Sequence, residues 1–464
     1  KYWIGDYTVE PENGGVGVFA HEFGHDLGLP DLYDTSGNTG GAENSTAFWT
    51  LMSSGSYGSS GDPEDGIGSK PMHMGNWEKF QLGWLDYEVA TAGQRSAHKV
   101  GPAETTTRHA QGVFVLLPDK KVPLDLGAPF AGEKFFYSGS GDDLDNTMTK
   151  EVDLGDGGTL TAQVRYDIED DWDYAYLTVD GEPIETNLST DTDPNGQNFG
   201  NGITGDSDDE WVELTATIPA QTSSASEIGF RYWTDGAEVR PGFQVDDVAL
   251  DGTPLGTAES EDEGWTFDGF RTTTGSEIQE FFNAYVLENR QYRGFDRSLE
   301  TGPYNFGWLN TEPDRVEHFS YQDGLLVSYW DASFEDNSVG DHPGGGLILP
   351  VDAHPELEHW ADGTLMRPRL QSYDSTFGLE RTESYTLHSN GVPSTIESRP
   401  AASLFDDTRS YWHDCDVHAC TGEHKGHHQP GWSSVDVPNT GSTVRVVGES
   451  ARGAFMEVVV NEGR

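Results

Sequence analysis

The sequence is poor in the groups that cross-link a chain or bind a polyanion. Its 464 residues include two cysteines, Cys415 and Cys420, and only 27 lysines and arginines against 80 aspartates and glutamates. A formal net charge of −53 repels phosphates, which argues against DNA, RNA and anionic membrane surfaces as partners. No apolar run reaches the roughly 18 residues of a membrane-spanning helix, and no signal peptide is visible. The sequence therefore predicts no membrane span and no nucleic-acid partner.

The excess acid is spread along the whole chain instead of forming a tail. With 34% hydrophobic and 11% aromatic residues the chain can still build cores, so it is not a disordered acidic protein. The excess carboxylates either form ordinary solvated surfaces or are an adaptation to high salt, where concentrated ions screen the repulsion between the protein's own negative charges. Because the excess recurs in every segment, we favour the second interpretation, an acidity like that of a haloarchaeal proteome.

The length predicts about two to four domains. Residues 14–29 and 73–85 have helical patterns, and we expect Val16, Phe19, Ala20, Phe23 and Leu27 to face a core. From about residue 96 the pattern changes to short alternating segments separated by Asp- and Gly-rich turns, which indicates a β-sandwich followed by more strands. The main predicted strands are 112–117, 160–168, 174–181, 211–219, 228–235, 243–252 and 454–463.

The stretch FAHEFGHDLGLPDLYD, residues 19–34, carries the clearest chemistry. His21 and His25 are four residues apart, so on a helix they lie one turn apart on the same face and can bind one zinc ion. Glu22 lies beside them, where it can take a proton from a zinc-bound water whose pKa the metal lowers toward about 7. Two histidines and a glutamate at this spacing predict metal-assisted hydrolysis of a peptide bond.

A third ligand follows at the spacing that such a site requires. Gly28 permits a sharp exit from the helix with a positive φ, and the chain then returns so that Asp31 can bind the metal from another direction. A catalytic zinc has three protein ligands and one open position. The alternative is a helix with a polar face that ends in a capping Gly-Leu-Pro, and the combined match favours zinc.

The segment HEFGHDLGLPD resembles the metzincin zinc-binding pattern, in its aspartate variant. Together with LYD, FWTLMSSGS and later segments such as NWEKFQLGWL and DGLLVSYWDASFEDNSVGDHPGGG, it is similar to the immune inhibitor A family of secreted metalloproteases. The resemblance covers most of the chain. It implies that His21, His25 and Asp31 are zinc ligands, that Glu22 is the general base, and that Met52 is the methionine of the turn beneath the metal. By spacing alone, Met52 is an ordinary core methionine.

The resemblance also implies a fold class, a multidomain chain with α+β and all-β parts. We expect the C-terminal part of a metzincin-like catalytic domain at 1–95 and β-sandwich (jelly-roll-like) domains after it. The expected divisions are the start of a β-rich accessory domain at 96–130, a β-sandwich at 131–257 and the rest of the accessory domain at 258–464. Some metzincins have a tyrosine two residues after the turn methionine. That position is Ser54 here, and the nearest tyrosine is Tyr57.

Only twenty residues precede His21, whereas in the family a sheet and the upper half of the cleft precede the motif helix. We therefore expect the chain to be a fragment or a proteolytic product, with its own cleaved N-terminal half as a possible partner.

Two further groups of residues suggest ligands. Carboxylates near predicted strand ends suit Ca²⁺, although acid is common throughout this chain; they are Asp142, Asp143, Asp145, Asp246 and Asp247, with Asp34 and Glu43 as weaker candidates near the zinc site. Cys415 and Cys420 lie in a histidine-rich patch. They form either a small disulfide-closed loop, which we favour for a secreted protein, or part of a second zinc site.

Two functions are compatible with these features. The first is a secreted zinc endopeptidase that acts on proteins or peptides in high salt. The second is a non-catalytic extracellular binding or surface protein whose β-sandwiches carry the function and whose protease remnant is inactive. Because His21, Glu22, His25 and Asp31 are all intact, we favour the enzyme.

Overall fold

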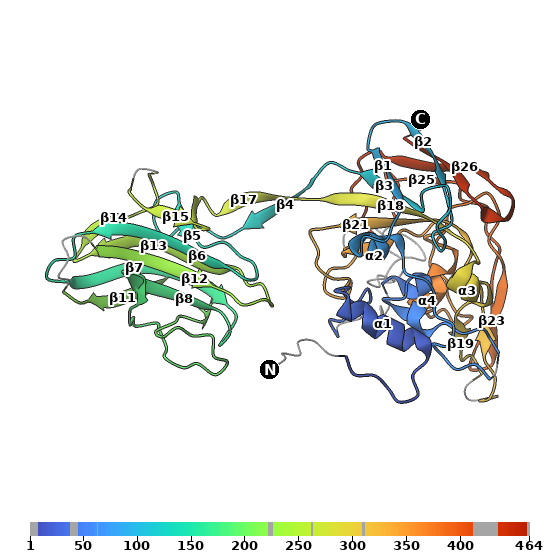
Figure 1. Ribbon diagram of the computed structural model, residues 1–464, viewed down its shortest axis with the longest axis horizontal. Helices are drawn as coiled ribbons and strands as arrows, with labels where there is room; N and C mark the ends of the chain where they lie inside the picture. Colours follow the sequence, from blue (N-terminus) through green and yellow to red (C-terminus); the bar gives the residue numbers. More distant parts are fainter. Residues whose placement is uncertain are drawn as a thin grey trace. The chain divides into compact units, whose positions relative to one another are not determined.

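The structure is a computed structural model that describes residues 8–37, 45–62, 64–220, 226–260, 263–308, 311–411 and 435–461. The chain forms two compact units (Figure 1). The first unit combines Lys1–Lys120 with Glu280–Arg464, and the second is Lys121–Gln279. The predicted zinc motif therefore shares a unit with residues that follow it by more than 250 positions.

A five-stranded sheet forms the centre of the first unit. Its order is β1 (Tyr87–Thr91), β3 (Gly112–Leu116), β18 (Asn283–Arg290), β21 (Gly324–Asp331) and β22 (Ile348–Pro350). The β1–β3 pair is parallel and the other pairs are antiparallel. Val113 and Val115 enter one hydrophobic core and Phe114 enters another, so the sheet is buried on both faces.

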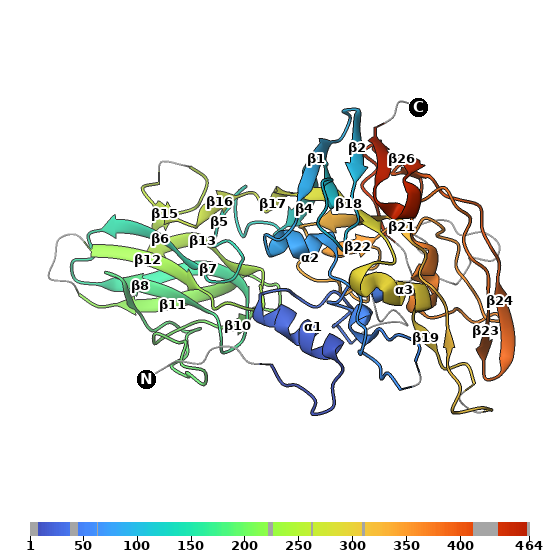
Figure 2. The ribbon, with the colours of Figure 1, turned by 45° about the vertical axis from the view of Figure 1, so that its right-hand side comes forward.

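One face of this sheet is covered by a second sheet and the other by helices, as Figures 1 and 2 show. The second sheet has the order β2 (Ser96–Val100), β27 (Met456–Val460), β26 (Thr443–Glu449) and β25 (Leu404–Asp406). Two small pairs complete the strands of this unit: β19 (Tyr304–Asn305) with β20 (Glu317–His318), and β23 (Tyr385–Ser389) with β24 (Val392–Ile396).

The helices that the structure describes in the first unit are short. They are α1 (Val16–Asp26), η1 (Ala47–Trp49), η2 (Ser54–Tyr57), α2 (Asn76–Gln81), η3 (Gly294–Asp296), α3 (Arg297–Thr301), α4 (Pro368–Gln371), η4 (Ser372–Asp374) and η6 (Ala451–Gly453). Leu29, Leu32 and Met52 share a core with Phe114 and Val286 of the central sheet. This core fixes the predicted zinc motif to the sheet.

The second unit is a β-sandwich of two antiparallel sheets around one hydrophobic core. One sheet has the order β10 (Gly205–Asp206), β7 (Gly158–Ile168), β13 (Gly242–Leu250), β5 (Phe135–Tyr137) and β16 (Arg271–Thr273), with β11 (Val212–Ile218) on β7 and β14 (Thr253–Gly256) on β13. The other has the order β15 (Thr266–Asp268), β6 (Asp145–Val152), β12 (Ser226–Trp233), β8 (Tyr174–Val179) and β9 (Glu182–Pro183). Strands β4 (Lys120–Asp125) and β17 (Ser276–Phe281) pair where the chain enters and leaves this unit.

The predicted helices and strands lie within a few residues of the observed ones. Residues 14–29 contain α1 and residues 73–85 contain α2, and each of the seven predicted strands overlaps an observed strand. The mostly β, multidomain class is confirmed.

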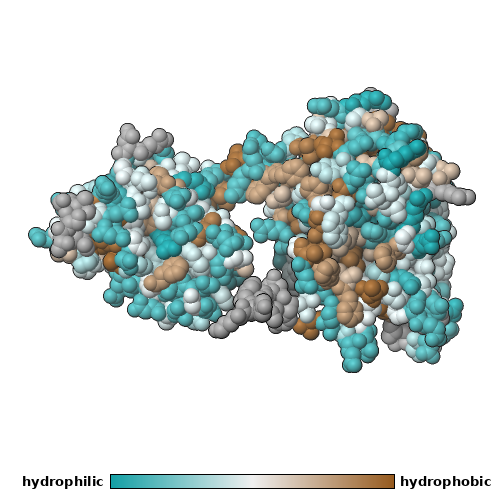
Figure 3. Space-filling model, in the orientation of Figure 1, coloured by the Kyte–Doolittle hydropathy of each residue, from teal (hydrophilic) through white to brown (hydrophobic). Residues whose placement is uncertain are grey.

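The predicted buried face of α1 is wrong. Val16, Phe19, Phe23 and Leu27 are 37–59% exposed, and Figure 3 shows brown, hydrophobic surface in the region of this helix. The buried residues of α1 are instead Gly17, His21 and Gly24. Glycines let the helix lie against the chain beneath it, because a Cβ on Gly17 would overlap the Ser56 carbonyl oxygen. Backbone proximity, not apolar side chains, therefore decides which face is inside.

Within the described residues, no helix combines the length and the apolar character needed to cross a membrane.

The contact between α1 and η2 predicts the effect of a single methyl group. Gly17→Ala forces the helix away from the Ser56 backbone, which cannot rotate aside, and should lower the free energy of unfolding by about 2 kcal/mol. Val16→Ala, on the exposed face of the same helix, should change it by less than about 0.5 kcal/mol. Urea-induced unfolding of both variants measures the difference, and equal stabilities would contradict the close packing.

Candidate metal centre

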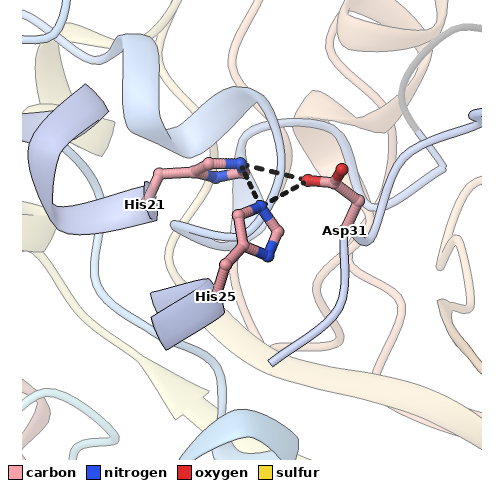
Figure 4. A group of neighbouring side chains, drawn as sticks. All are labelled: His21, His25 and Asp31. Atoms are coloured by element: carbon pink, nitrogen blue, oxygen red, sulfur yellow. Dashed lines mark hydrogen bonds and ion pairs between the residues drawn. The ribbon is translucent and has the colours of Figure 1, made fainter. Parts of the chain in front are cut away.

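His21 and His25 project from one side of α1 toward Asp31, which follows the helix (Figure 4). The helix ends at Asp26 with Leu27 as its C-cap, and Gly28 has a φ of +88°, the left-handed conformation that the sequence predicted. The N–H groups of Gly28 and Leu29 bond back to the carbonyls of His25 and Gly24 at 2.8 and 3.0 Å. This turn reverses the chain within a few residues and brings Asp31 back to the histidines.

The three side chains place one atom each around a common point. His21 Nε2 lies 3.2 Å from His25 Nε2 and 3.0 Å from Asp31 Oδ1. The distance from His25 Nε2 to the same carboxylate oxygen is 3.3 Å. Asp31 Oδ1 is buried and accepts no conventional hydrogen bond. The structure thus brings together the three predicted ligands.

Backbone carbonyls determine which nitrogen of each ring faces this point. His21 Nδ1 lies 2.9 Å from the Leu51 oxygen, and His25 Nδ1 lies 2.8 Å from the Leu29 oxygen. Because a carbonyl only accepts hydrogen bonds, each Nδ1 carries a hydrogen and each Nε2 of a neutral ring presents a lone pair. Two lone pairs and a carboxylate oxygen therefore converge, an arrangement that attracts a cation.

The electrostatics of the cluster agree with this arrangement. Burial lowers the pKa of His21, but the Asp31 carboxylate, the Leu51 carbonyl and the charge of Glu22 outweigh burial, so the net pKa is raised. Burial raises the pKa of Asp31, but the two histidines and Tyr33 outweigh it, so the net pKa is lowered. Both shifts favour positive charge at the centre of the cluster.

Glu22 and His21 line a pocket of about 560 Å³. The described residues that surround it are Val18, His21, Glu22, Tyr33, Asp34, Ser53, Ser54, Ser56, Tyr57, Ile67, Tyr304 and Arg369. The glutamate is partly exposed, on the pocket side of the helix that carries the histidines. The pocket is large enough for several atoms of a peptide chain beside the convergent ring nitrogens.

Tyr33 supports the carboxylate from the other side. Its ring stacks on His21, with centroids 6.3 Å apart and planes 25° apart, and its hydroxyl hydrogen-bonds to Asp31. Burial and the charge of Asp31 raise the pKa of Tyr33 to about 12, so the hydroxyl keeps its hydrogen and donates it. This tyrosine was included in the LYD segment in the sequence analysis but was assigned no part in the metal site. The signal was its position two residues after Asp31.

Met52 lies beneath α1. Its side chain is fully buried, and a Cβ on Gly24 would lie 2.5 Å from its sulfur. The Met52 carbonyl accepts a hydrogen bond from the Leu32 N–H at 2.8 Å, which ties this turn to the segment that carries Asp31. Ser54 and Tyr57 line the pocket, and the tyrosine side chain is 47% exposed.

The residues predicted to bind calcium do not share one site. Asp145 forms a two-point ion pair with Arg231 at 2.6 and 2.9 Å, and buried Asp246 accepts the N–H groups of Ala131 and Asp247. Asp34 accepts hydrogen bonds from the Ser36 N–H and hydroxyl and from the Gly340 N–H. Glu43, Cys415 and Cys420 lie outside the described residues.

The carboxylates that do gather in the second unit are different ones. Oxygens of Glu169, Asp173 and Asp235 lie within 4.8 Å of one another, and the Asp143 N–H bonds to the Asp235 carbonyl at 2.6 Å. Calcium binding by this unit stays a prediction.

A second buried group lies in the first unit. Asp352, His354 and Asp374 bring ligand-type atoms within 4.8 Å of one another, and Arg399 Nη1 lies 3.5 Å from Asp374 Oδ2. The guanidinium offsets the charge of these carboxylates, so the group is explained as a buried ion-pair network. The sequence gave no sign of it, because its members come together only through tertiary packing.

Three family models match consecutive parts of the chain. The immune inhibitor A peptidase M6 catalytic domain matches residues 1–85, the immune inhibitor A-like MAM domain matches 96–275, and the immune inhibitor A-like metallopeptidase VEG domain matches 278–456. The MAM match covers all but the last four residues of the second unit, and the other two matches lie in the first unit apart from residues 278 and 279.

Curated relatives agree with these matches. The chain is 35% identical over 390 residues to the pre-pro-metalloprotease PrtV of two Vibrio cholerae O1 strains, which covers 81% of this chain and 40% of PrtV. It is 29% identical over 442 residues to immune inhibitor A of Bacillus thuringiensis subsp. alesti, which covers 88% of this chain and 60% of that protein. The chain thus spans less than two thirds of these relatives. They are bacterial, so the comparisons do not support a haloarchaeal origin.

The carboxylate cluster of the second unit predicts a pH-dependent stability. Burial and the charges of Asp235, Asp142 and Glu238 outweigh the Asp235 N–H and raise the pKa of Asp173 to about 6. The folded state therefore binds more protons than the unfolded state between about pH 4 and 6. Protonation of Asp173 stabilises the folded state at low pH, and this contribution to the free energy of unfolding is lost as the pH rises through 6. In EDTA at pH 8, Asp173→Asn should stabilise the sandwich by about 1 kcal/mol, with no gain at pH 4.

Thermal unfolding at both pH values measures this effect, with exposed Asp170→Asn as the matched control. A gain of the same size at pH 4 and pH 8 would contradict the role of charge. If Ca²⁺ occupies the cluster, adding it should stabilise the wild type more than Asp173→Asn, and equal responses would argue against this site.

Proposed function

We propose that this chain is an immune inhibitor A-like M6 metallopeptidase and acts as a zinc-dependent endopeptidase with Glu22 as general base; the three domain matches and the metalloprotease relatives support the proposal. The zinc ligands are His21, His25 and Asp31. The observation that carries the proposal is the convergence of three ligand atoms beside a pocket lined by Glu22.

The geometry of the three atoms fits zinc. A tetrahedral ion with bonds of about 2.0–2.1 Å holds its ligand atoms about 3.3–3.4 Å apart. The observed separations are 3.0, 3.2 and 3.3 Å. Two imidazole nitrogens and one carboxylate oxygen suit zinc better than calcium, which prefers six to eight oxygen ligands. The carbonyls of Leu51 and Leu29 orient both rings for binding through Nε2.

When bound, zinc supplies a Lewis acid that polarises the peptide carbonyl and makes water acidic enough to attack near neutral pH. Glu22 accepts a proton from the attacking water as the water oxygen bonds to the carbonyl carbon. The carboxyl group then delivers that proton to the amine nitrogen as the C–N bond breaks. One water is consumed, and one carboxyl and one amino group are formed.

The supporting residues have separate roles in this proposal. Tyr33 holds Asp31 through its hydroxyl and packs on His21, so it is a positioning residue. Met52 is the turn methionine of a metzincin-like catalytic domain, which its position beneath Gly24 supports. Tyr57 lines the pocket, but within the described residues no hydrogen bond joins it to a proposed ligand, so we assign it no catalytic role.

The setting we propose is extracellular and salt-rich. The family resemblance is to secreted proteases, and their substrates are proteins or peptides. The formal charge of −53 supports function at high ionic strength, where the Debye length falls to about 3 Å at 1 M salt. Assays therefore belong in concentrated KCl.

The proposal predicts that metal binding and catalysis separate at Glu22. The wild type in concentrated KCl should bind about one zinc per chain and cleave casein, and a chelator should abolish both properties. Glu22→Gln should retain the zinc and lose at least about 100-fold in activity, because the amide cannot accept the proton. Zinc analysis and casein hydrolysis on the same samples test this.

Each failure has its own meaning. A wild type without zinc removes the metal assignment. Zinc without casein cleavage leaves a metal site but contradicts catalysis by this chain, and an active Glu22→Gln contradicts the general base.

The role of Tyr33 predicts a change in zinc affinity. Tyr33→Phe removes the hydroxyl that bonds to Asp31 but retains the ring on His21, and it should weaken zinc binding by about 10-fold or more. Competition with a chromogenic chelator measures the zinc Kd. Tyr57→Phe removes a hydroxyl from the same pocket without that contact and serves as the control. Equal zinc Kd values for the two variants and the wild type would refute the positioning role.

A further inference from the structure

The pocket that contains His21 and Glu22 also contains a cation from the distant C-terminal part of the first unit. Arg369, in α4, is the only lysine or arginine among the described lining residues. Helix α4 lies against η1, and Tyr321 donates a hydrogen bond to the Arg369 carbonyl at 2.5 Å. The backbone that carries this guanidinium is therefore held in place by tertiary packing.

Two aromatic rings hold the guanidinium itself. Its central carbon lies 5.4 Å from the ring centre of Phe48 and 5.4 Å from that of Tyr304. These two rings contact each other edge to face with centroids 6.2 Å apart, and Phe48 is fully buried. Cation–π contacts restrain the plane of an arginine without using its N–H groups. The side chain is thus oriented while its hydrogen-bonding capacity stays available.

No N–H group of Arg369 has a hydrogen-bond acceptor in the described parts of the chain, and its Nε is shielded from solvent. Other arginines of the same unit are paired: Arg290 with Asp296 at 2.5 Å, Arg315 with Glu312 at 3.1 Å and Arg399 with Glu358 at 2.5 Å. With 80 acidic against 27 basic residues, carboxylate partners are abundant in this chain. An arginine that lines the pocket without one is suited to an anion from outside.

We infer that Arg369 binds a carboxylate of the peptide substrate, so that the site favours peptides that present one there; this inference rests on the proposed peptidase function. A guanidinium presents parallel N–H groups that match both oxygens of a carboxylate. Glu22 and Asp34 line the same pocket, and their charges oppose a doubly charged phosphate more than a singly charged carboxylate. The carboxylate comes either from an acidic side chain or from the C-terminus of the peptide, and the experiment distinguishes the two.

Binding of matched peptides tests the inference without turnover. Three fluorescently labelled peptides share one sequence: the first has a single Glu and an amidated C-terminus, the second has Gln at that position and the same amide, and the third has Gln and a free C-terminal carboxylate. Fluorescence anisotropy with the zinc-loaded Glu22→Gln chain measures each Kd in moderate and in concentrated KCl. We expect one of the two carboxylate peptides to bind about tenfold more tightly than the doubly neutral peptide.

Variants connect this preference to the guanidinium. Arg369→Gln should remove the tenfold difference, and Arg369→Lys, which retains the charge but not the planar fork, should retain part of it. Arg315→Gln removes an arginine of the same unit that does not line the pocket and should leave the difference unchanged. Circular dichroism confirms that each variant is folded.

The outcomes separate this inference from the proposed function. A preference for the Glu peptide assigns the carboxylate to a substrate side chain, and a preference for the free C-terminus assigns it to the chain end. Equal affinities for all three peptides, a preference that survives Arg369→Gln, or no binding of any peptide would overturn the inference. Zinc content and casein cleavage test the peptidase independently of each of these results.

Discussion

The mutual approach of two unprotonated ring nitrogens and a carboxylate oxygen is the constraint on which the candidate metal centre depends. His21 and His25 bring their Nε2 atoms to 3.2 Å, and Asp31 places an oxygen within 3.3 Å of both. Without a cation between them, these lone pairs repel one another. The surrounding contacts hold the cluster together: a backbone carbonyl accepts a hydrogen bond from each Nδ1, and the Tyr33 hydroxyl donates one to the carboxylate.

The motif depends on a scaffold formed by other parts of the chain. The turn around Met52 lies beneath α1 and shares a core with β3 and β18 of the central sheet. Near it, Arg290 of β18 is 1% exposed and lies 3.2 Å from Glu288 and 2.5 Å from Asp296. Removing one partner of such a buried ionic network typically destabilises a protein by about 3–5 kcal/mol. The candidate metal centre thus depends on strands that follow it by more than 250 residues, which explains why both segments form one unit.

The local parts of this structure could be predicted from the sequence, and the non-local parts could not. The spacing of His21, Glu22 and His25 predicts one helical face, and Gly28 predicts the reversal that brings Asp31 back. These features depend on helix and turn geometry over a dozen residues. The apolar spacing of α1 gave the wrong buried face, because periodicity cannot show that the opposite face approaches a backbone carbonyl so closely that only glycine fits.

The same distinction applies to ligands and partners. Calcium was predicted at Asp145 and Asp246, and it stays a prediction there; in the structure Asp145 pairs with an arginine and Asp246 accepts backbone N–H groups. In a chain with acid throughout, composition alone could not show which carboxylates are already paired. Arg369 was missed for a related reason. It follows His21 by more than 300 residues, and only the tertiary structure shows that it lines the same pocket without a carboxylate partner among the described residues.

The proposed peptidase, an acidic chain that binds a carboxylate of its substrate, must separate two electrostatic effects that act over different distances. The net charge of −53 repels an anionic substrate over many ångströms, and salt suppresses this term, because the Debye length falls to about 3 Å at 1 M. A contact pair between a carboxylate and a guanidinium held against two aromatic rings is shorter than that length, and partial burial screens it less. Concentrated salt then removes the repulsion at long range while much of the recognition at short range remains. The acidity of the surface and an unpaired arginine in the pocket are therefore compatible at high ionic strength.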